Sequence, residues 1–401
     1  MKKKILVVSQ YFYPEQFRIN DMCSEWVESG YDVTVLTGIP NYPTGNFFEG
    51  YGIFKRRIDK VGNVNVIRLP IVPRKKNSIF LALNYLSFLV SGYLWAIFTK
   101  KKFDEVFIYE VSPMTQAIPG VKYAKKHNVQ SIIYVMDLWP DNFIELSGIK
   151  NKIIINQITK MVKYIYKNVS TIFISSPGFN KKICDLGDYS SKIVYWPQYA
   201  ESFYRPTIDK SECINFDPEK FNITFAGNIG YAQGLEILPE VAQKLEEEKL
   251  EVHFNIIGNG RFKSELIKIV NNNNLNDYFT FYEPVEAIEI PKILGESDAA
   301  LVSLSNNPLF SLTIPAKVQS ILATGTPIIA SADGVLENII RESGAGVWSE
   351  AGNAQKLVEN IRRMLLMDEI SIKKMKNNAL SYSNEEFLKQ KLMLKLYEYW
   401  D

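Results

Sequence analysis

Cysteine and histidine are scarce in this sequence. The 401 residues include three cysteines and two histidines. Cys23, Cys184 and Cys213 are too far apart for a zinc-ligand pattern or a disulfide framework, so we expect a protein of a reducing compartment. His127 is expected at a helix end and His253 inside a strand. A histidine base at the end of a strand is therefore not expected.

Net charge and several catalytic patterns are also missing. Lysine and arginine number 46 against 44 acidic residues, a net charge of +2, which excludes a strong general attraction to nucleic acid. The sequence has no Asp-x-Asp pair for a metal-bound nucleotide and no Gly-x-Ser-x-Gly elbow. Residues 1–9 are too short and too strand-like for a signal peptide. We expect no metal, no cofactor and a cytoplasmic location.

The first predicted loop has no glycine. An apolar run containing Ile5 to Val8 suits a buried parallel strand, and "QYFYPEQFRIND" (10–21) follows it. In a dinucleotide-binding domain this loop would be glycine-rich and would hold phosphate. The absence of glycine from this loop disfavours a nicotinamide dehydrogenase. The loop carries aromatic rings with Glu15, Arg18 and Asn20 instead.

Strands and helices alternate along both halves of the chain. Predicted strands include "KILVVSQ" and "DEVFIYEV" in the first half, and "FNITFAG" and "VHFNIIG" in the second. A polar stretch with two prolines, "AESFYRPTIDKSECINFDPEK", separates the halves as a linker. We predict an α/β fold with two Rossmann-like domains facing a central cleft. The expected domains are residues 1–205 and 206–383, followed by an amphipathic helix at 384–401.

Residues 77–99 form a long segment without charge, and lysines and an arginine flank it at 74–76 and 100–102. The segment is long enough to span a bilayer. Asn84, Ser87 and Ser91 recur at helical spacing and form a narrow polar stripe. Because predicted strands lie on both sides, three interpretations remain. The segment is a buried crossover helix, a crossover helix whose apolar surface enters the membrane interface, or a spanning helix.

Three loops in the second half suit anions. "GNIGYAQG" begins at Gly227, follows a predicted strand and opens a helix. "GNGRFKSEL", which carries Arg261, also lies between a predicted strand and a helix. "NPLFSLTIPAKVQS" places Lys317 in the first turn of a helix, where the helix dipole disfavours a cation unless an anion is bound. The structural alternatives are an ordinary tight turn for the glycines and a solvated helix residue for Lys317. Together the loops indicate a site for a nucleotide diphosphate.

Several unusual motifs occur together in the sequence. They include "YFYPEQFRIND", "LTGIPNYPTGNFFEGYG", "YEVSPMTQAIPG", "VMDLWPDNFIELSGI", "FAGNIGYAQGLEIL" and "LFSLTIPAKVQSILATGTPII". Through these motifs the chain resembles glycosyltransferase family 4, and within it the bacterial surface-polysaccharide branch that includes the N-acetyl-L-fucosamine transferases. The resemblance implies a GT-B fold, retention of anomeric configuration, a nucleotide-sugar donor on the second domain and no required metal. It also implies that the C-terminal helix packs back on the first domain.

The resemblance further implies a substrate and a place of action. The donor is expected to be a UDP-sugar, with an N-acetylated deoxyhexose as the sugar class. The acceptor is expected to be a polyprenyl-pyrophosphate-linked saccharide of capsule or O-antigen biosynthesis. The protein would then act as a peripheral enzyme on the inner face of the cell membrane, with residues 74–102 as the membrane interface.

The same resemblance suggests site residues. Those expected to act in catalysis are Lys317 and Arg261, which would stabilise the leaving diphosphate, and Asp137, which would contact the acceptor hydroxyl. Expected donor-binding residues are Gly227, Asn228, Gly230, Gln233, Gly258, Val285, Ser311, Thr313, Ser320 and Glu337. Expected acceptor-binding residues are Glu15, Arg18, Asn20, Asn41, Tyr42, Glu110 and Trp139. A surface salt bridge is the alternative for Arg18, and a helix N-cap beside Pro140 is the alternative for Asp137.

The chain departs from the family pattern at the donor site. Asn228 and Gln233 stand where many members have arginine and lysine. Leu312 and Ser320 stand where many have two glutamates, and Glu337 is the candidate substitute. Two other functions therefore stay open: a sugar-nucleotide epimerase of the same fold and a non-catalytic sugar-nucleotide-binding protein. The apolar segment at 77–99 argues against the epimerase, which needs no membrane.

Overall fold

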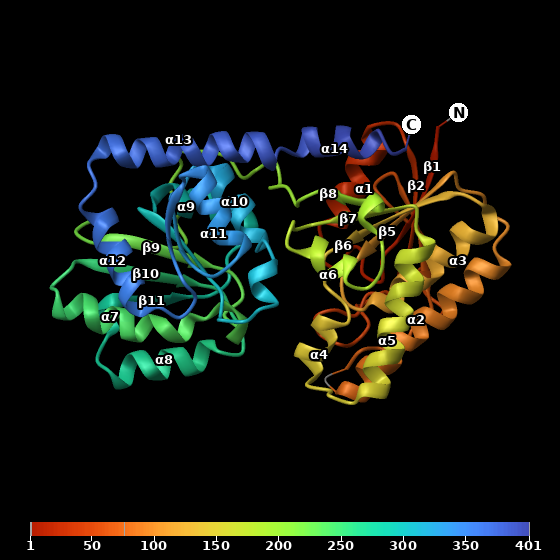
Figure 1. The fold of residues 1–401 in the computed structure, drawn as a ribbon, viewed down its shortest axis with the longest axis horizontal. Helices are drawn as coiled ribbons and strands as arrows, with labels where there is room; N and C mark the ends of the chain where they lie inside the picture. The colour runs from red at the N-terminus through yellow and green to blue at the C-terminus, as the bar shows by residue number, and fades with distance from the viewer. Residues whose placement is uncertain (1, 76, 401) are drawn as a thin grey trace. The chain divides into compact units, whose positions relative to one another are not determined.

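The chain folds into two α/β units, as shown by a computed structural model that describes residues 2–75 and 77–400 (Figure 1). The first unit comprises residues 1–175 and 179–195. The second comprises residues 176–178 and 196–401. Each contains one sheet of mainly parallel strands, so the predicted α/β class is confirmed.

The first unit is built on an eight-stranded sheet with the order β3-β4-β2-β1-β5-β6-β7-β8. Only β3 runs antiparallel to its neighbour among the described strands. The central strand β1 is buried from its second residue onwards, as expected for a strand covered on both faces. The strands are β1 Lys4–Val8, β2 Asp32–Gly38, β3 Ile58–Val61, β4 Val64–Leu69, β5 Glu105–Glu110, β6 Gln130–Val135, β7 Thr171–Ile174 and β8 Ile193–Tyr195.

Helices connect these strands. They are α1 Ile19–Glu28, α2 Ser78–Phe98, α3 Ala117–His127, α4 Asp141–Ser147, α5 Lys152–Asn168 and α6 Phe179–Cys184. Helix α2 connects β4 to β5, which places the predicted apolar segment in a crossover between parallel strands. Strand β3 was not predicted. It is a short edge strand whose apolar Ile58 is exposed while Asp59 is half-buried, so its residues lack the apolar–polar alternation that marks a strand in sequence.

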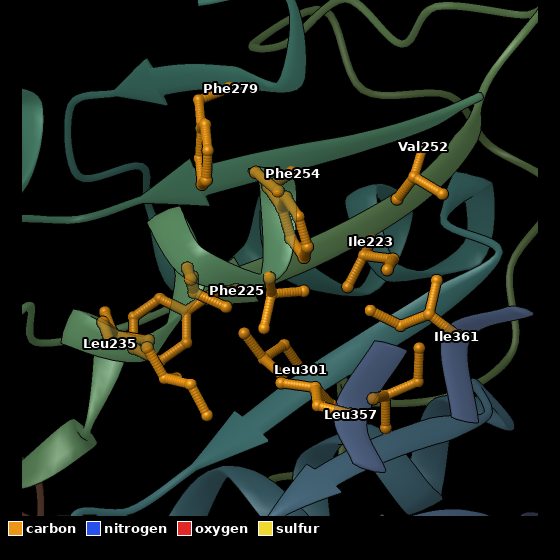
Figure 2. Close-up of a cluster of buried hydrophobic side chains, with 14 of the residues drawn as sticks. Ile223, Phe225, Leu235, Val252, Phe254, Phe279, Leu301, Leu357 and Ile361 are labelled. Carbon is orange, nitrogen blue, oxygen red and sulfur yellow. The ribbon is translucent and has the colours of Figure 1, made fainter. Parts of the chain in front are cut away.

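The second unit has a six-stranded parallel sheet with the order β11-β10-β9-β12-β13-β14. Its core packs Phe225, Phe254 and Leu301 against residues of α12 (Figure 2). The strands are β9 Phe221–Ala226, β10 Val252–Ile257, β11 Phe279–Tyr282, β12 Ala299–Ser303, β13 Ile328–Ser331 and β14 Gly346–Ser349. The helices are α7 Leu238–Glu247, α8 Lys263–Asn272, α9 Ile290–Glu296, α10 Ala316–Thr324, α11 Val335–Ser343, α12 Ala354–Leu365, α13 Glu369–Glu386 and α14 Lys389–Tyr397.

The order of strands in this sheet reverses next to β9, since β10 lies on one side of it and β12 on the other. In open α/β sheets ligands bind beyond the carboxyl ends of the strands at such a switch point. The loops that follow β9, β10 and β12 are therefore the first place to look for a site in this unit. The predicted packing of residues 384–401 on the first domain stays a prediction.

Candidate functional site

Two glycine loops interlock at the carboxyl ends of β9 and β10. Gly227 and Gly258 both adopt positive φ, at 142° and 136°. A Cβ on Gly258 would lie 1.9 Å from the carbonyl oxygen of Gly227, and one on Gly260 would lie 2.2 Å from that of Ile229. The two loops therefore pass each other with no room for a side chain. Ile229 N–H donates to Asn259 O at 2.8 Å, which holds the contact.

Lys317 brings its ammonium group to the first of these loops. It lies in the first turn of α10, and its Nζ donates to Gln233 Oε1 at 2.9 Å. The same Nζ lies 3.7 Å from the centroid of the Phe225 ring and 3.4 Å from where a Cβ on Gly227 would be. The side chain as a whole is half-buried, but its charged end is inside. The interpretation of Lys317 as a solvated helix residue is therefore wrong.

The environment of Lys317 leaves its charge without an anionic partner among the described groups. Burial lowers the pKa of its ammonium group from 10.5 to about 7. The ring of Phe225 and the neutral amide of Gln233 compensate the charge only weakly. An anion bound at the Gly227 loop would remove this deficit, because an opposite charge within about 4–6 Å favours the protonated amine.

Lys263 is a second lysine that the sequence did not single out. It is 7% exposed, and its Nζ donates to the carbonyl oxygens of Gly258 and Tyr282 at 2.8 and 2.9 Å. It also pairs with Glu283 at 2.9 Å. The lysine thus ties the ends of β10 and β11 and holds the second glycine loop. Its position two residues after Arg261 in "GNGRFKSEL" was the available signal.

The other expected donor residues fall into three groups. Asn228 and Arg261 are exposed on the two glycine loops, and the N–H of Gln233 donates to Gly230 O at 3.0 Å. Ser311 and Thr313 bond within their own turn, to Pro308 O and Phe310 O, both at 2.9 Å.

The third group lies further inside or is already paired. Ser320 is 7% exposed and Val285 packs beside Ile257. Glu337, in the first turn of α11, forms an ion pair with Arg341 at 2.9 Å. The substitute role considered for Glu337 therefore competes with this ion pair.

In the first unit, Glu15 connects two loops from inside. It is 2% exposed and accepts hydrogen bonds from the backbone N–H groups of Asn41 at 2.9 Å and Tyr42 at 2.7 Å, and from that of Phe12. Burial raises its pKa from 4.5 to about 7, although these three bonds oppose the shift. In this conformation Glu15 holds the loops that follow β1 and β2, instead of offering its carboxylate to an acceptor.

Asn20 and Asn41 also have local partners. Asn20 accepts from Tyr13 N–H at 3.1 Å and donates to Glu15 O at 2.7 Å. Asn41 is 1% exposed, donates to Ile39 O at 2.9 Å and accepts from Arg74 N–H at 3.1 Å. These side chains stabilise the first loop, so a direct contact with the acceptor would be made by more exposed residues.

An aromatic cluster of one buried, one half-buried and one exposed ring lies beside these side chains. Tyr11 stacks on Phe17 with ring centroids 5.0 Å apart, and Tyr42 lies 5.7 and 5.5 Å from the two rings. The guanidinium of Arg74 is 5.2 Å from the Tyr42 centroid. Tyr42 is 38% exposed, and Arg18 is half-buried just before α1. Phe17 and Arg74 were not among the predicted residues, because they join the cluster only through the fold.

A buried arginine supports this loop from beneath. Arg68 on β4 has no exposed side-chain surface and donates to Tyr13 O at 3.1 Å. It also pairs with Asp59 at 3.2 Å and lies 4.9 Å from the centroid of the Tyr51 ring. One guanidinium therefore joins the loop after β1 to the β3–β4 hairpin, using the planar geometry that suits several simultaneous acceptors.

Asp137 follows β6 and is held by its neighbours. Its Oδ2 accepts from Ser112 N–H at 2.7 Å and its Oδ1 from Asn142 Nδ2 at 3.1 Å. Trp139 is 7% exposed and donates to Ser112 Oγ at 3.1 Å. Helix α4 begins at Asp141 after Pro140 and has no side-chain cap, so the N-cap interpretation of Asp137 is wrong. Asp137 is half-buried and oriented, as an acceptor contact would require.

Glu110, the last residue of β5, has no exposed surface, so it cannot make the predicted acceptor contact in this conformation. Burial raises its pKa well above 4.5, and the nearby charge of Asp137 adds to the rise. Glu110 is therefore expected to keep its proton in the folded state.

The raised pKa of Glu110 predicts how stability depends on pH. The folded chain keeps a proton that the unfolded chain releases above 4.5, so the free energy of unfolding falls as pH rises. Glu110→Gln cannot ionise and removes that loss. Its stability relative to wild type should grow by about 1.4 kcal/mol per pH unit above 4.5, up to the folded pKa.

Denaturant unfolding of the two proteins from about pH 5 to about pH 8 measures this difference. The exposed Glu49 provides the control, since Glu49→Gln should follow wild type at every pH. A constant offset between Glu110→Gln and wild type would show that Glu110 ionises normally.

The described residues contain no cluster of metal ligands and one apolar helix of membrane-spanning length. No group of three or more histidine, cysteine, aspartate or glutamate side chains that could hold a metal ion occurs within residues 2–75 and 77–400. Over the same residues, one helix is long and apolar enough to cross a membrane, Ser78–Phe98, with a mean hydropathy of 1.5. Only 22% of its most apolar window is buried, so the interpretation as a buried crossover helix is wrong.

Comparisons with known proteins bear on the family and the fold of the chain. Residues 208–382 match the family "Glycosyl transferases group 1". The chain is 25% identical over 384 residues to a protein of Escherichia coli (strain K12) named as a colanic acid biosynthesis glycosyl transferase, WcaI. That alignment covers 91% of this chain and 92% of WcaI.

Solved structures share the fold along the whole chain. Sucrose-phosphate synthase from Thermosynechococcus elongatus superposes with a TM-score of 0.78 at 14% identity, covering 100% of this chain and 98% of its own. Anabaena HepE in complex with UDP gives 0.68 at 11% identity, covering 99% of both chains. The chain is therefore a glycosyltransferase with the GT-B fold, and its residues 208–382 are similar to the glycosyl transferases group 1 family.

Proposed function

We propose that this protein is a retaining, metal-independent glycosyltransferase of family 4. It transfers a sugar from a UDP-sugar to a membrane lipid-linked saccharide in surface-polysaccharide biosynthesis. The observation that carries the donor side is the position of Lys317 Nζ beside Gly227 and Gln233, where its positive charge lacks an anion. The name of WcaI supports the polysaccharide context, and the UDP bound to HepE supports the choice of nucleotide.

The proposed chemistry is electrostatic. As the bond between the anomeric carbon and the diphosphate breaks, Lys317, Arg261 and the N–H groups of the Gly227 loop stabilise the charge on the leaving oxygen. The acceptor hydroxyl, oriented by Asp137, attacks from the face that the diphosphate leaves, and its proton passes to the leaving phosphate oxygen. The exposed ring of Tyr42, which packs against Phe17 and Tyr11, offers a flat face to the acceptor saccharide.

The location follows from the same proposal. Capsule and O-antigen acceptors are carried on polyprenyl pyrophosphate, so the enzyme would work as a peripheral protein on the inner face of the cell membrane. Residues 74–102 are the proposed interface. The donor sugar is proposed to be an N-acetylated deoxyhexose.

Calorimetric titration with UDP, GDP and TDP tests the donor site. We expect selective UDP binding that is coupled to proton uptake. At about pH 8 the Lys317 amine, with its pKa of about 7, is mostly neutral, and a bound diphosphate restores its charge. UDP binding to the wild-type protein should then be accompanied by the uptake of about one proton more, at most, than UDP binding to Lys317→Met. At about pH 6 the amine is already protonated and the difference should vanish.

The control variant Lys317→Met keeps an unbranched apolar side chain and removes the ammonium group that lies over Phe225. Proton uptake that is the same in wild type and Lys317→Met would contradict the proposed phosphate contact. If none of the three nucleotides bound, even with detergent and a polyprenyl-phosphate analogue present, the donor proposal would fail. UDP-sugar binding without turnover on lipid acceptors would favour the non-catalytic alternative.

A further inference from the structure

Helix α2 is amphipathic in the reverse sense from a helix of a water-soluble domain. Its polar side chains point inward: Asn84 is fully buried, accepts from Gln10 Nε2 at 2.7 Å and donates to Val72 O at 2.6 Å. Ser87 accepts from Val72 N–H at 2.9 Å. Its outward face is apolar, with exposed fractions of 42% to 74% for the side chains Ile79, Leu83, Leu86, Val90, Leu94 and Phe98.

This arrangement has a cost in water. Surface helices normally turn their apolar stripe to the core, and large contiguous apolar patches mark a contact with another molecule or a membrane. Asn84 and its partners also fix α2 to the domain. A spanning orientation would strip the buried bonds of Asn84 to Gln10 and Val72. The face is therefore suited to a surface that α2 lies against, not one that it crosses.

A hollow accompanies the exposed face. Between α2, α3 and α5 lies a groove of about 460 Å³, within the range of ligand pockets. Its described lining carries no charged group: Leu89, Val90, Tyr93, Leu94, Ile118 and Met161. The three helices lie next to one another in the first unit (Figure 1). Such a lining fits a hydrocarbon chain and offers nothing to a polar ligand.

Helix α5 extends the apolar face beyond the segment at 74–102. Ile153 and Ile154, in its first turn, are 74% and 42% exposed. Tyr164, about three turns further towards its end, is 41% exposed. Helix α5, which lines the groove through Met161, thus also exposes apolar side chains.

The charge around the groove has one sign. Helices α2, α3 and α5 contain no aspartate or glutamate, although the chain as a whole has 44 acidic residues. Lys125, Lys126, Lys160 and Lys163 are exposed on α3 and α5, and Lys122 lies 5.4 Å from the centroid of the Tyr93 ring. Basic side chains around an apolar face match the surface of an anionic lipid leaflet, where each is favourable near the headgroups.

We infer that α2 and α5 lie together on an anionic phospholipid leaflet and that one lipid acyl chain occupies the groove between them. The lysines of α3 and α5 then meet the phosphate headgroups, while Val90, Leu94 and Ile153 enter the acyl region. This inference rests on the proposed function only for the role of membrane binding, which is to keep the enzyme beside a lipid-linked acceptor. The binding itself depends on the first unit alone.

Co-sedimentation of the full chain with vesicles tests the face. Binding to mixed phosphatidylcholine and phosphatidylglycerol vesicles should exceed binding to phosphatidylcholine alone by tenfold or more, and should weaken with salt. Leu94→Asn and Ile153→Asn should each lower vesicle affinity about tenfold. Ile370→Asn, at a position 80% exposed in the second unit, is the matched control and should bind as wild type does. Equal effects of all three substitutions would overturn the inference.

Phosphatidylglycerol with a photoreactive diazirine in one acyl chain tests the groove. Mass spectrometry should find the adducts on peptides that contain Leu89 to Leu94 and Met161. Adducts confined to other peptides would overturn the acyl-chain site. Labelling there by a diazirine polyprenyl phosphate, without labelling by the phospholipid, would also overturn it and would assign the groove to the acceptor.

The nucleotide titration separates this inference from the proposed function. Leu94→Asn and Ile153→Asn should leave UDP binding unchanged, which also shows that they fold. If UDP failed to bind while vesicle binding persisted, the proposed function would fail and the lipid face would stand.

Discussion

Replacing Lys317 with alanine is expected to lower turnover about 10²–10³-fold, equivalent to about 2.7–4 kcal/mol of barrier. The lysine is the one side chain of the described donor loops whose ammonium meets Gln233, Phe225 and Gly227 together. A preorganised donor of this kind acts on the charge that develops on the leaving oxygen, so kcat should fall more than donor affinity.

Release of UDP from UDP-sugars in the presence of lipid-linked acceptors measures this loss. Lys317→Met separates the lost charge from the lost packing, because it keeps an unbranched apolar side chain and removes the ammonium group over Phe225. Lys374→Ala removes an exposed lysine of α13 and should leave turnover unchanged. Turnover of Lys317→Ala within about threefold of wild type would remove Lys317 from the proposed mechanism.

Gly258→Ala is expected to disrupt the donor loops and to lower the free energy of unfolding by about 2–5 kcal/mol. Gly258 has φ at +136°, which L-residues rarely adopt, and its new Cβ would lie 1.9 Å from Gly227 O. The obstacle is a backbone atom, so no side-chain rotation relieves it. Either β9 and β10 separate at their ends or the Gly227 loop moves away from Lys317, and UDP affinity should fall in both cases.

The control for this experiment is Gly352→Ala. Gly352 also has positive φ, at 77°, but nothing lies within 4 Å of a Cβ placed there. It should lose only the conformational term, about 1 kcal/mol, and bind UDP normally. Thermal unfolding and UDP titration of both variants make the comparison. Equal melting temperatures for the two would show that the loops adapt and that their interlocking is not needed.

Much of the fold was accessible from sequence because buried parallel strands and glycine turns leave local signals. The runs that became β1, β5, β9 and β10 are mainly apolar, and glycines follow the last two. Strand β3 left no such signal. Its residues lie in a basic stretch and pair antiparallel with β4 at the edge of the sheet, and only the hairpin contact makes them a strand.

The candidate site divides in the same way. Glycine loops and a lysine in a first helical turn are patterns of neighbouring residues, so Gly227, Gly258 and Lys317 could be selected from sequence. The positions of the charged ends of side chains could not be predicted from sequence. That Glu15 turns its carboxylate to three backbone N–H groups, and that Lys263 ties two strand ends, depends on contacts between residues up to 27 positions apart.

Helix α2 shows most clearly what each level decided. Sequence periodicity established that Asn84, Ser87 and Ser91 share one face and that the rest of the helix is apolar. The hydrophobic effect alone would turn that apolar surface inward. Tertiary structure reversed the choice, because Gln10 and Val72 of neighbouring elements offer Asn84 partners inside the domain. Which face of a helix is buried depends on what it packs against, and no spacing within the helix records that.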